Sequence, residues 1–597
     1  MTRSSEISEV PPAPSPVPRT ADRVAALERH LGDPRDPGNP LGYAAVLAAD
    51  RRGELPLGGE RLLDAFGLHE EIVPLALGGR LTGLDTAAQL LRAVFRRDFA
   101  LGRGHGSASL ISALFVWCDG TPEQRARAAR LVLSGGRLAV AFQNMSYGTA
   151  FADGDLTLTR PPHEGGRLHG RSPLMANAPR AAGFVVLARH ADADGTHSAL
   201  LLERAALSPG AIRLLSPYEA TAVRRLPAGQ LEFADWPVPD GSVLGAAGDG
   251  TAVALRALQV SRPLVPSMAV GCADTALRAV ITAIQARSPG VRTLTSRYAR
   301  RAITSAFADT LVCDCLLLAS IRSLHLLPEE SSVWTAAAMY LVPRLLRQST
   351  GDLAPVLGPG ALQEEGAFGT FRKHLRDLSE LPPGPVGAAA ALATLAPQLP
   401  FLARTSWTAS PPPPGLFSAS ASLPPLDPGR LDLAAGGDTL MAVLPHAEEA
   451  LGSLPAGDPD AEVLRAQVRS LVAELRSFGE SCRALPARDL TALATPHSYA
   501  LVERYTLLAA AAAALGVWLF GDGTGFWSDR AWLISCLGRI QLRLGLPEPT
   551  IGERLGEALL AEVVERCVQG RSLDLYDVVL GAPHALMGDG RDDGKTA

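Results

Sequence analysis

The chain has 597 residues, of which 47% are hydrophobic and 20% are charged. A chain of this length exceeds what one compact core can organise, so three to four domains or layers are expected. The formal net charge of −5 at pH 7 provides no basic surface, which excludes nucleic acid as the expected partner.

Residues 1–22 are rich in proline and serine and are predicted to form a disordered tail without the apolar core of a secretory signal. Seven cysteines are scattered without a C-x-x-C spacing. This pattern predicts reduced, mostly buried thiols, no metal site and a cytoplasmic location. Arginine supplies nearly all of the positive charge and alanine, glycine and proline are abundant, which indicates a GC-rich coding bias, as in an actinomycete.

Helical and extended patterns follow one another in large blocks. Residues 23–135 are helical in pattern and end in TPEQRARAARLVLSG, where Thr121 is placed to cap a helix. Residues 136–245 contain short runs such as GFVVLARH and QLEFADWPVP, which predict a small β-domain. Long apolar-faced segments over residues 246–408 predict a helical bundle.

A proline-rich segment, residues 409–428, is predicted to be a stiff linker to a second helical domain, residues 429–583, with a polar tail over residues 584–597. The longest apolar run, residues 506–520, has 15 residues. A bilayer span needs about 20, so we expect a buried helix and no membrane span. The predicted fold is mostly α-helical with a central small β-domain and an additional C-terminal helical domain.

Several dispersed motifs occur in a fixed order. They are GTPEQRARAARLVLSGG at 120–136, LHGRSPLMANAPRAAGFVVLAR at 168–189, LEFADWPVPDGSVLGAAGDG at 231–250, and VLGPGALQEEG followed by Arg376–Asp377. Together they resemble the acyl-CoA dehydrogenase superfamily, and the extra C-terminal helices resemble its longer acyl-CoA oxidase branch. The resemblance implies FAD between the β-domain and the helices, a glutamate that removes a proton next to a thioester carbonyl, and a homodimer.

The residues that would serve the flavin and the base are replaced in this chain. The W-I-S/T element that packs against the flavin corresponds to Leu174–Ala176, and only Asn177 keeps the pattern. Proline stands at 383 and 385, where the resemblance places the catalytic glutamate, and Ser261 stands at the alternative position of that base. Glu380 is the nearest carboxylate, displaced by three to five positions.

The candidate residues follow from the resemblance. The candidate catalytic residues are Tyr147, Gln143 and Glu380. The substrate pocket is expected to include Phe142, Asn144, Met145, Leu174, Met175, Asn177, Arg262, His105, Glu364 and Glu365. If FAD is bound, its contacts are expected at Gln143, Ala176, Arg287, Gly358 and Gly360.

Each of these residues also has a structural interpretation. Glu364 and Glu365 at a helix start would complement the helix dipole. Arg262 would pair with a carboxylate inside the helical domain. His105, in a glycine-flanked loop, would be structural, and Tyr147 would belong to a core or a loop.

Three functions remain open from the sequence. The favoured one is a flavin-poor, repurposed enzyme of secondary metabolism that folds a polyketide-like substrate for ring closure, with no cofactor. The second is an FAD-dependent dehydrogenase, oxidase or monooxygenase acting on an acyl-CoA or acyl-carrier-protein substrate. The third is a binding or scaffold protein whose site has decayed.

Overall fold

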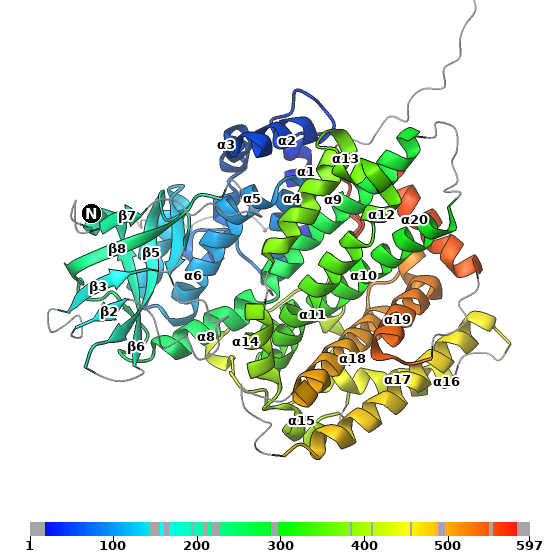
Figure 1. Cartoon of the computed structure of the whole chain (residues 1–597). Helices are drawn as coiled ribbons and strands as arrows, with labels where there is room; N and C mark the ends of the chain where they lie inside the picture. The colour runs from blue at the N-terminus through cyan, green and yellow to red at the C-terminus, as the bar shows by residue number, and fades with distance from the viewer. Residues whose placement is uncertain are drawn as a thin grey trace, which may run out of the picture.

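A computed structural model describes residues 18–141, 156–159, 166–172, 175–192, 196–207, 212–215, 226–287, 296–381, 385–407, 410–453, 457–486, 496–547 and 553–581. Figure 1 shows a sheet domain at one side of a large helical body, with the N-terminal helices between them and the C-terminal helices at the opposite side. This arrangement agrees with the predicted order of helices, strands and helices.

The N-terminal helices form the first block. They are α1 (Thr20–Leu31), α2 (Tyr43–Arg52), α3 (Leu57–Phe66), α4 (Leu84–Arg97), α5 (Phe99–Leu101), α6 (Ala108–Asp119) and α7 (Pro122–Leu133). The predicted cap of α7 is confirmed, because Thr121 Oγ1 accepts a hydrogen bond from the Gln124 amide and the Gln124 side chain accepts one from the Thr121 amide. This capping box satisfies two donors that the helix start would leave unpaired.

The β-domain contains nine strands among the described residues. They are β1 (Arg137–Ala141), β2 (Thr157–Leu158), β3 (Arg167–Arg171), β4 (Met175–Ala176), β5 (Ala181–His190), β6 (His197–Glu203), β7 (Ile212–Leu215), β8 (Ala228–Pro237) and β9 (Val243–Leu244). The strand order is β4-β8-β3-β2-β5-β6-β9, with β1 parallel to β5 and β7 paired with β8. The domain has its own core, which includes Phe184, Leu231 and Trp236.

The central bundle follows the sheet. Its helices are α8 (Gly250–Ser261), α9 (Leu264–Arg287), α10 (Arg297–Leu326), α11 (Ser331–Gly351), α12 (Ala354–Leu357), α13 (Gly366–Asp377), α14 (Pro385–Leu395) and α15 (Leu399–Thr405). Between α8 and α9 the helix is interrupted at Arg262 and Pro263, since proline cannot donate the helical hydrogen bond. Helix α9 packs against α4, α10 and α13, and so joins the N-terminal helices to the bundle.

The segment predicted as a linker packs against the bundle along much of its length. Arg322 on α10 donates hydrogen bonds to the carbonyls of Gly415 and Ala421, and His325 Nδ1 lies 2.8 Å from the carbonyl oxygen of Pro424. The division of the chain into domains stays a prediction, but this segment is held in place by α10.

The C-terminal helices complete the fold. They are α16 (Val443–Gly452), α17 (Pro459–Arg483), α18 (Pro496–Phe520), α19 (Arg530–Leu544) and α20 (Glu553–Gln569). One continuous hydrophobic core extends from the N-terminal helices through the bundle into these helices. All seven cysteines are free and buried, as predicted.

Three helical segments of the described chain have the length and apolar composition that a membrane crossing requires: Gly250–Ala286, Arg297–Leu326 and Pro496–Phe520. Between 78% and 94% of their apolar windows is buried inside the fold. The apolar run at 506–520 therefore lies in a buried helix, α18, as the sequence predicts.

Candidate active site

Several predicted site residues lie outside the described residues. These are Phe142, Gln143, Asn144, Met145, Tyr147 and Leu174, and the side chain of Arg287 is also outside them. Their predicted roles stay predictions. The remaining candidates can be placed.

A π-helix, Gly102–Ser107, lies between α5 and α6 and forms the centre of the candidate site. Its glycines allow it to pack closely against α4. A Cβ on Gly102 would lie 2.3 Å from Cδ2 of Phe95, and one on Gly106 would lie 2.2 Å from Cδ2 of Leu91. Single π-helical turns inside longer helices occur frequently at functional sites.

His105 lies in this π-helix and is buried. Its Nε2 lies 2.8 Å from Asp64 Oδ1 on α3, and Asp64 also accepts a hydrogen bond from Arg137 at 3.0 Å. The hydrogen bond from His105, followed by the one from Arg137, lowers the pKa of Asp64, whereas burial lowers the pKa of His105. Asp64 is therefore an anion that fixes a neutral imidazole, and the enclosed Nδ1 of His105 has no hydrogen-bond partner in the described part of the chain.

Asn177 links the β-domain to the π-helix. It is fully buried with a φ of 67°, its Nδ2 donates to the carbonyl oxygen of Gly104 at 2.7 Å, and its Oδ1 accepts from Arg180 Nε at 3.1 Å. Arg180 Nη1 in turn lies 2.6 Å from Glu60 on α3. Asn177 thus serves the junction between two domains with both ends of its amide.

The strand before Asn177 does not fit a flavin held by side-chain hydrogen bonds. Met175 is buried in the core of the β-domain, and Ala176 pairs with Ala228 on β8 and has no side-chain donor. Met175 and Ala176 therefore offer an isoalloxazine ring no side-chain donor, and the Asn177 amide is engaged at the domain junction through both its nitrogen and its oxygen.

Arg103 belongs to the same π-helix, and the charge of Glu380 acts on its guanidinium. Burial lowers the pKa of Arg103, and the charge of Glu380 partly opposes that shift. Glu380 ends a short 3-10 turn, Leu378–Glu380, directly after α13 and is exposed. The predicted displaced base is therefore an exposed carboxylate that acts on an arginine.

Arg262 lies at the break between α8 and α9. Its Nη2 donates to Thr394 Oγ1 on α14 at 3.1 Å, and burial lowers its pKa to about 10. In the described residues no carboxylate pairs with it, so the alternative of an ion pair within the helical domain finds no partner there. The neighbouring Ser261 hydroxyl donates to the carbonyl of Leu258 at 3.2 Å.

Two predicted pocket carboxylates face solvent instead. Glu364 lies 3.2 Å from Arg372, and Glu365 lies 3.1 Å from Arg51, in exposed ion pairs at the start of α13. Gly358 has a φ of 56° and Gly360 is buried, both in the turn before this helix. The structure brings His105, Asn177 and Glu380 to the π-helix, and it places Glu364 and Glu365 on the surface.

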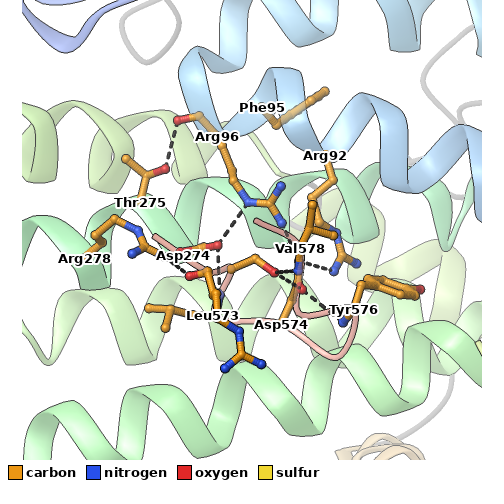
Figure 2. A network of polar contacts seen from close by, with 12 residues as sticks. Arg92, Phe95, Arg96, Asp274, Thr275, Arg278, Leu573, Asp574, Tyr576 and Val578 are labelled. Carbon is orange, nitrogen blue, oxygen red and sulfur yellow. Dashed lines mark hydrogen bonds and ion pairs between the residues drawn. The ribbon is translucent and has the colours of Figure 1, made fainter. Parts of the chain in front are cut away.

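Figure 2 shows a polar network on the face of α4 that meets α9. Arg92 pairs with Asp314 at 2.6 Å and with Asp574 at 3.1 Å, and Arg96 pairs with Asp574 at 2.5 Å and with Asp274 at 3.0 Å. All five side chains are buried. Cations and anions alternate in this network, so their charges compensate one another. The ion pairs join α4 to α9, to α10 and to the loop after α20, and so fix the position of α4 and of the π-helix that follows it.

No protein-family model and no curated protein matches the chain. Solved structures do match. An acyl-CoA dehydrogenase complexed with FAD from Bacillus anthracis has a TM-score of 0.64 at 14% identity, over 92% of this chain and 91% of that one. Butyryl-CoA dehydrogenase from Megasphaera elsdenii has a TM-score of 0.54 at 16% identity, over 62% of this chain and 95% of that one.

A structure of PigA with FAD and proline has a TM-score of 0.54 at 17% identity, over 62% of this chain and 95% of that one. The chain therefore has the acyl-CoA dehydrogenase fold, and the predicted fold class is confirmed. The match over 92% of the chain includes the additional helical region.

Proposed function

We propose that this protein is an enzyme that uses the acyl-CoA dehydrogenase fold for ring closure of a polyketide-like acyl substrate without redox chemistry. The observation that carries the proposal is the exposure of Glu380, the only carboxylate in residues 378–385. It is exposed and acts on Arg103. A carboxylate that faces solvent is not held against a substrate carbon, whereas proton abstraction needs a carboxylate within hydrogen-bond reach of that carbon.

Ring closure asks little of the side chains beyond positioning. If both reacting ends of one chain are held in a near-attack geometry, several kcal/mol of the barrier is removed without an acid, a base or an oxidant. One or two hydrogen-bond donors would polarise an enone carbonyl. We assign that role to Gln143 or Tyr147, which follow β1, and the placement of the substrate to the region beside the π-helix.

The residues near the π-helix support this assignment by their charges. His105 is neutral and oriented by Asp64, so it is able to accept a proton but presents no cation to the substrate. Arg103 is the positive group of the site, and Arg262, at the α8–α9 break, is a second half-buried guanidinium. A homodimer, a secondary-metabolite pathway and a cytoplasmic location remain parts of this proposal.

A second candidate is a flavin-dependent oxidoreductase. It is favoured by the matched structures, of which the Bacillus anthracis enzyme and PigA are FAD complexes. Against it stands the segment Met175–Asn177, in which Met175 and Ala176 have no side-chain donor and the Asn177 amide is bonded to Gly104 and Arg180. Backbone groups could still hold a flavin, so the two candidates differ in an observable way.

The mass balance of the reaction separates them. Ring closure is an isomerisation, so the product has the mass of the substrate, whereas dehydrogenation removes two hydrogens and monooxygenation adds an oxygen. A linear triene–enone thioester would be incubated with the protein, without added flavin or electron acceptor, and the products followed by mass spectrometry. We expect a new product of unchanged mass. Loss of hydrogen or gain of oxygen, or product formation only when flavin is added, would contradict the proposal.

A further inference from the structure

Arg103 is a charged side chain whose donors are not used within the described fold. It is part-exposed in the π-helix, and within the described residues its guanidinium makes no hydrogen bond to a protein acceptor. Its guanidinium nitrogens are also not among the fully enclosed side-chain atoms that lack a hydrogen-bond partner. Its N–H donors are therefore accessible to a group that enters the site.

The neighbouring arginines differ from Arg103 in this respect. Arg180 is compensated by Glu60 at 2.6 Å, and Arg137 by Asp64 at 3.0 Å. Both of these carboxylates belong to α3. The charge that acts on Arg103 comes from Glu380, which is exposed at the end of a turn and makes no ion pair with it at contact distance. A carboxylate in that position is free to be replaced.

An incoming anion would bind more tightly at Arg103 than at a fully exposed arginine. The guanidinium stays protonated even where burial lowers its pKa, and a planar carboxylate matches its fork through two parallel hydrogen bonds. Partial removal from water strengthens the attraction between the two charges.

We propose that Arg103 binds an anionic group of the substrate, a carboxylate or an enolate carried by the acyl chain, and that this group takes the place of Glu380. The assignment rests on the function proposed above, since it names the substrate class of the same site. Fixing the charged end of a flexible chain would restrict the conformers in which its other end reacts, which is the positioning that ring closure requires.

The test is equilibrium binding of a simple probe, measured by calorimetry. Monomethyl sebacate carries one carboxylate on an apolar chain, and dimethyl sebacate is its neutral counterpart. We expect the wild-type protein to bind the monoester more tightly than the diester. Arg103→Gln should lose about tenfold or more of the monoester affinity, the scale of a lost hydrogen bond between charged groups, and Arg103→Lys should lose less. Arg61→Gln, at an exposed arginine of α3, is the matched control and should bind as wild type.

The affinity of Glu380→Gln for the monoester is a second measurement, which should not change if Arg103 has only a structural role. Removal of the competing carboxylate should increase the affinity for the monoester, and this measurement decides the matter if Arg103→Gln melts at a much lower temperature than wild type. Equal affinity in wild type and Arg103→Gln, no preference for the monoester, or weaker binding by Glu380→Gln would overturn the proposal. Binding that depends on Arg103 without any ring-closed product would leave the anion site standing and remove only the proposed reaction.

Discussion

Arg92 Nη1 on α4 lies 3.1 Å from Asp574 Oδ2, although the two residues are 482 positions apart in the chain. The same carboxylate oxygen accepts from Arg96 Nη2 at 2.5 Å, and both contacts are buried. The loop after α20 therefore reaches back to the helix that supports the candidate site. The integrity of the π-helix should depend on a residue close to the C-terminal end of the described chain.

Asp574→Asn should destabilise the protein strongly. The substitution would leave Arg92 and Arg96 in the interior with less negative charge, and breaking a buried ion pair from one side costs about 3–5 kcal/mol. Urea denaturation would measure the loss. Glu557→Gln, which breaks an exposed pair with Arg300, is the control and should cost less than about 1 kcal/mol. Similar small losses of stability in both variants would show that the buried network does not stabilise the position of α4.

Gly102→Ala should destabilise the fold although alanine favours helices. Its Cβ would lie 2.3 Å and 2.5 Å from two ring atoms of Phe95, so α4 or the π-helix would have to shift. Overpacking of this kind costs about 1–3 kcal/mol. Gly351→Ala, at the end of α11 with no atom within 4 Å of the added Cβ, should be neutral or slightly stabilising. Thermal unfolding of the two variants side by side would check this, and equal melting temperatures would argue against close packing at Gly102.

Asn177→Ala should cost more stability than Asn177→Gly. Both substitutions remove the hydrogen bonds to Gly104 and Arg180, but alanine also has to adopt a φ of 67°. The left-handed conformation costs an L-residue other than glycine about 1–2 kcal/mol. Chemical denaturation of both variants isolates this conformational term. A glycine variant as unstable as the alanine variant would contradict the strained backbone at this junction.

Asp438 should make stability fall as pH rises. Its carboxylate accepts from Trp334 Nε1, Trp407 Nε1 and Tyr505 Oη, yet burial dominates and raises its pKa from 3.8 to about 6. The nearby Glu330 contributes in the same direction. A raised pKa in the folded state means that the folded protein binds the proton more tightly, so the stabilisation is complete below pH 3.8 and is lost as pH rises through 6.

The size of this effect is at most about 3 kcal/mol, because one pKa unit corresponds to about 1.4 kcal/mol. The measurement is the free energy of unfolding between pH 4 and pH 7 for wild type and for Asp438→Asn, in which this titration is removed. The difference between the two proteins should shift with pH in favour of the variant at the upper end of that range. A constant difference would rule out the raised pKa.

The sequence predicts the fold well because the fold depends on local periodicity. The strand runs between 136 and 245 and the capping Thr121 lie within single elements, where a pattern of a few residues decides the structure. The ion pairs Arg92–Asp574 and Arg180–Glu60 join distant segments. No local pattern distinguishes these arginines from the many surface arginines of the chain.

The candidate site was predictable only in part. His105 and Asn177 stand out because their motifs can be located, and the structure places both at the π-helix. Glu364 and Glu365 resemble a polar cluster in sequence, but the turn before α13 directs them to surface arginines. The π-helix itself reads as a glycine-flanked loop, because its conformation follows from packing against Phe95 and Leu91.

We propose that this chain uses the acyl-CoA dehydrogenase fold without flavin chemistry. The most direct test is the visible absorption spectrum of the purified protein, taken before and after heat denaturation and again after dialysis against FAD. We expect a colourless protein that does not retain added FAD. Flavin bands in the native spectrum, with stoichiometric release of flavin on denaturation, would contradict it and assign the protein to redox chemistry.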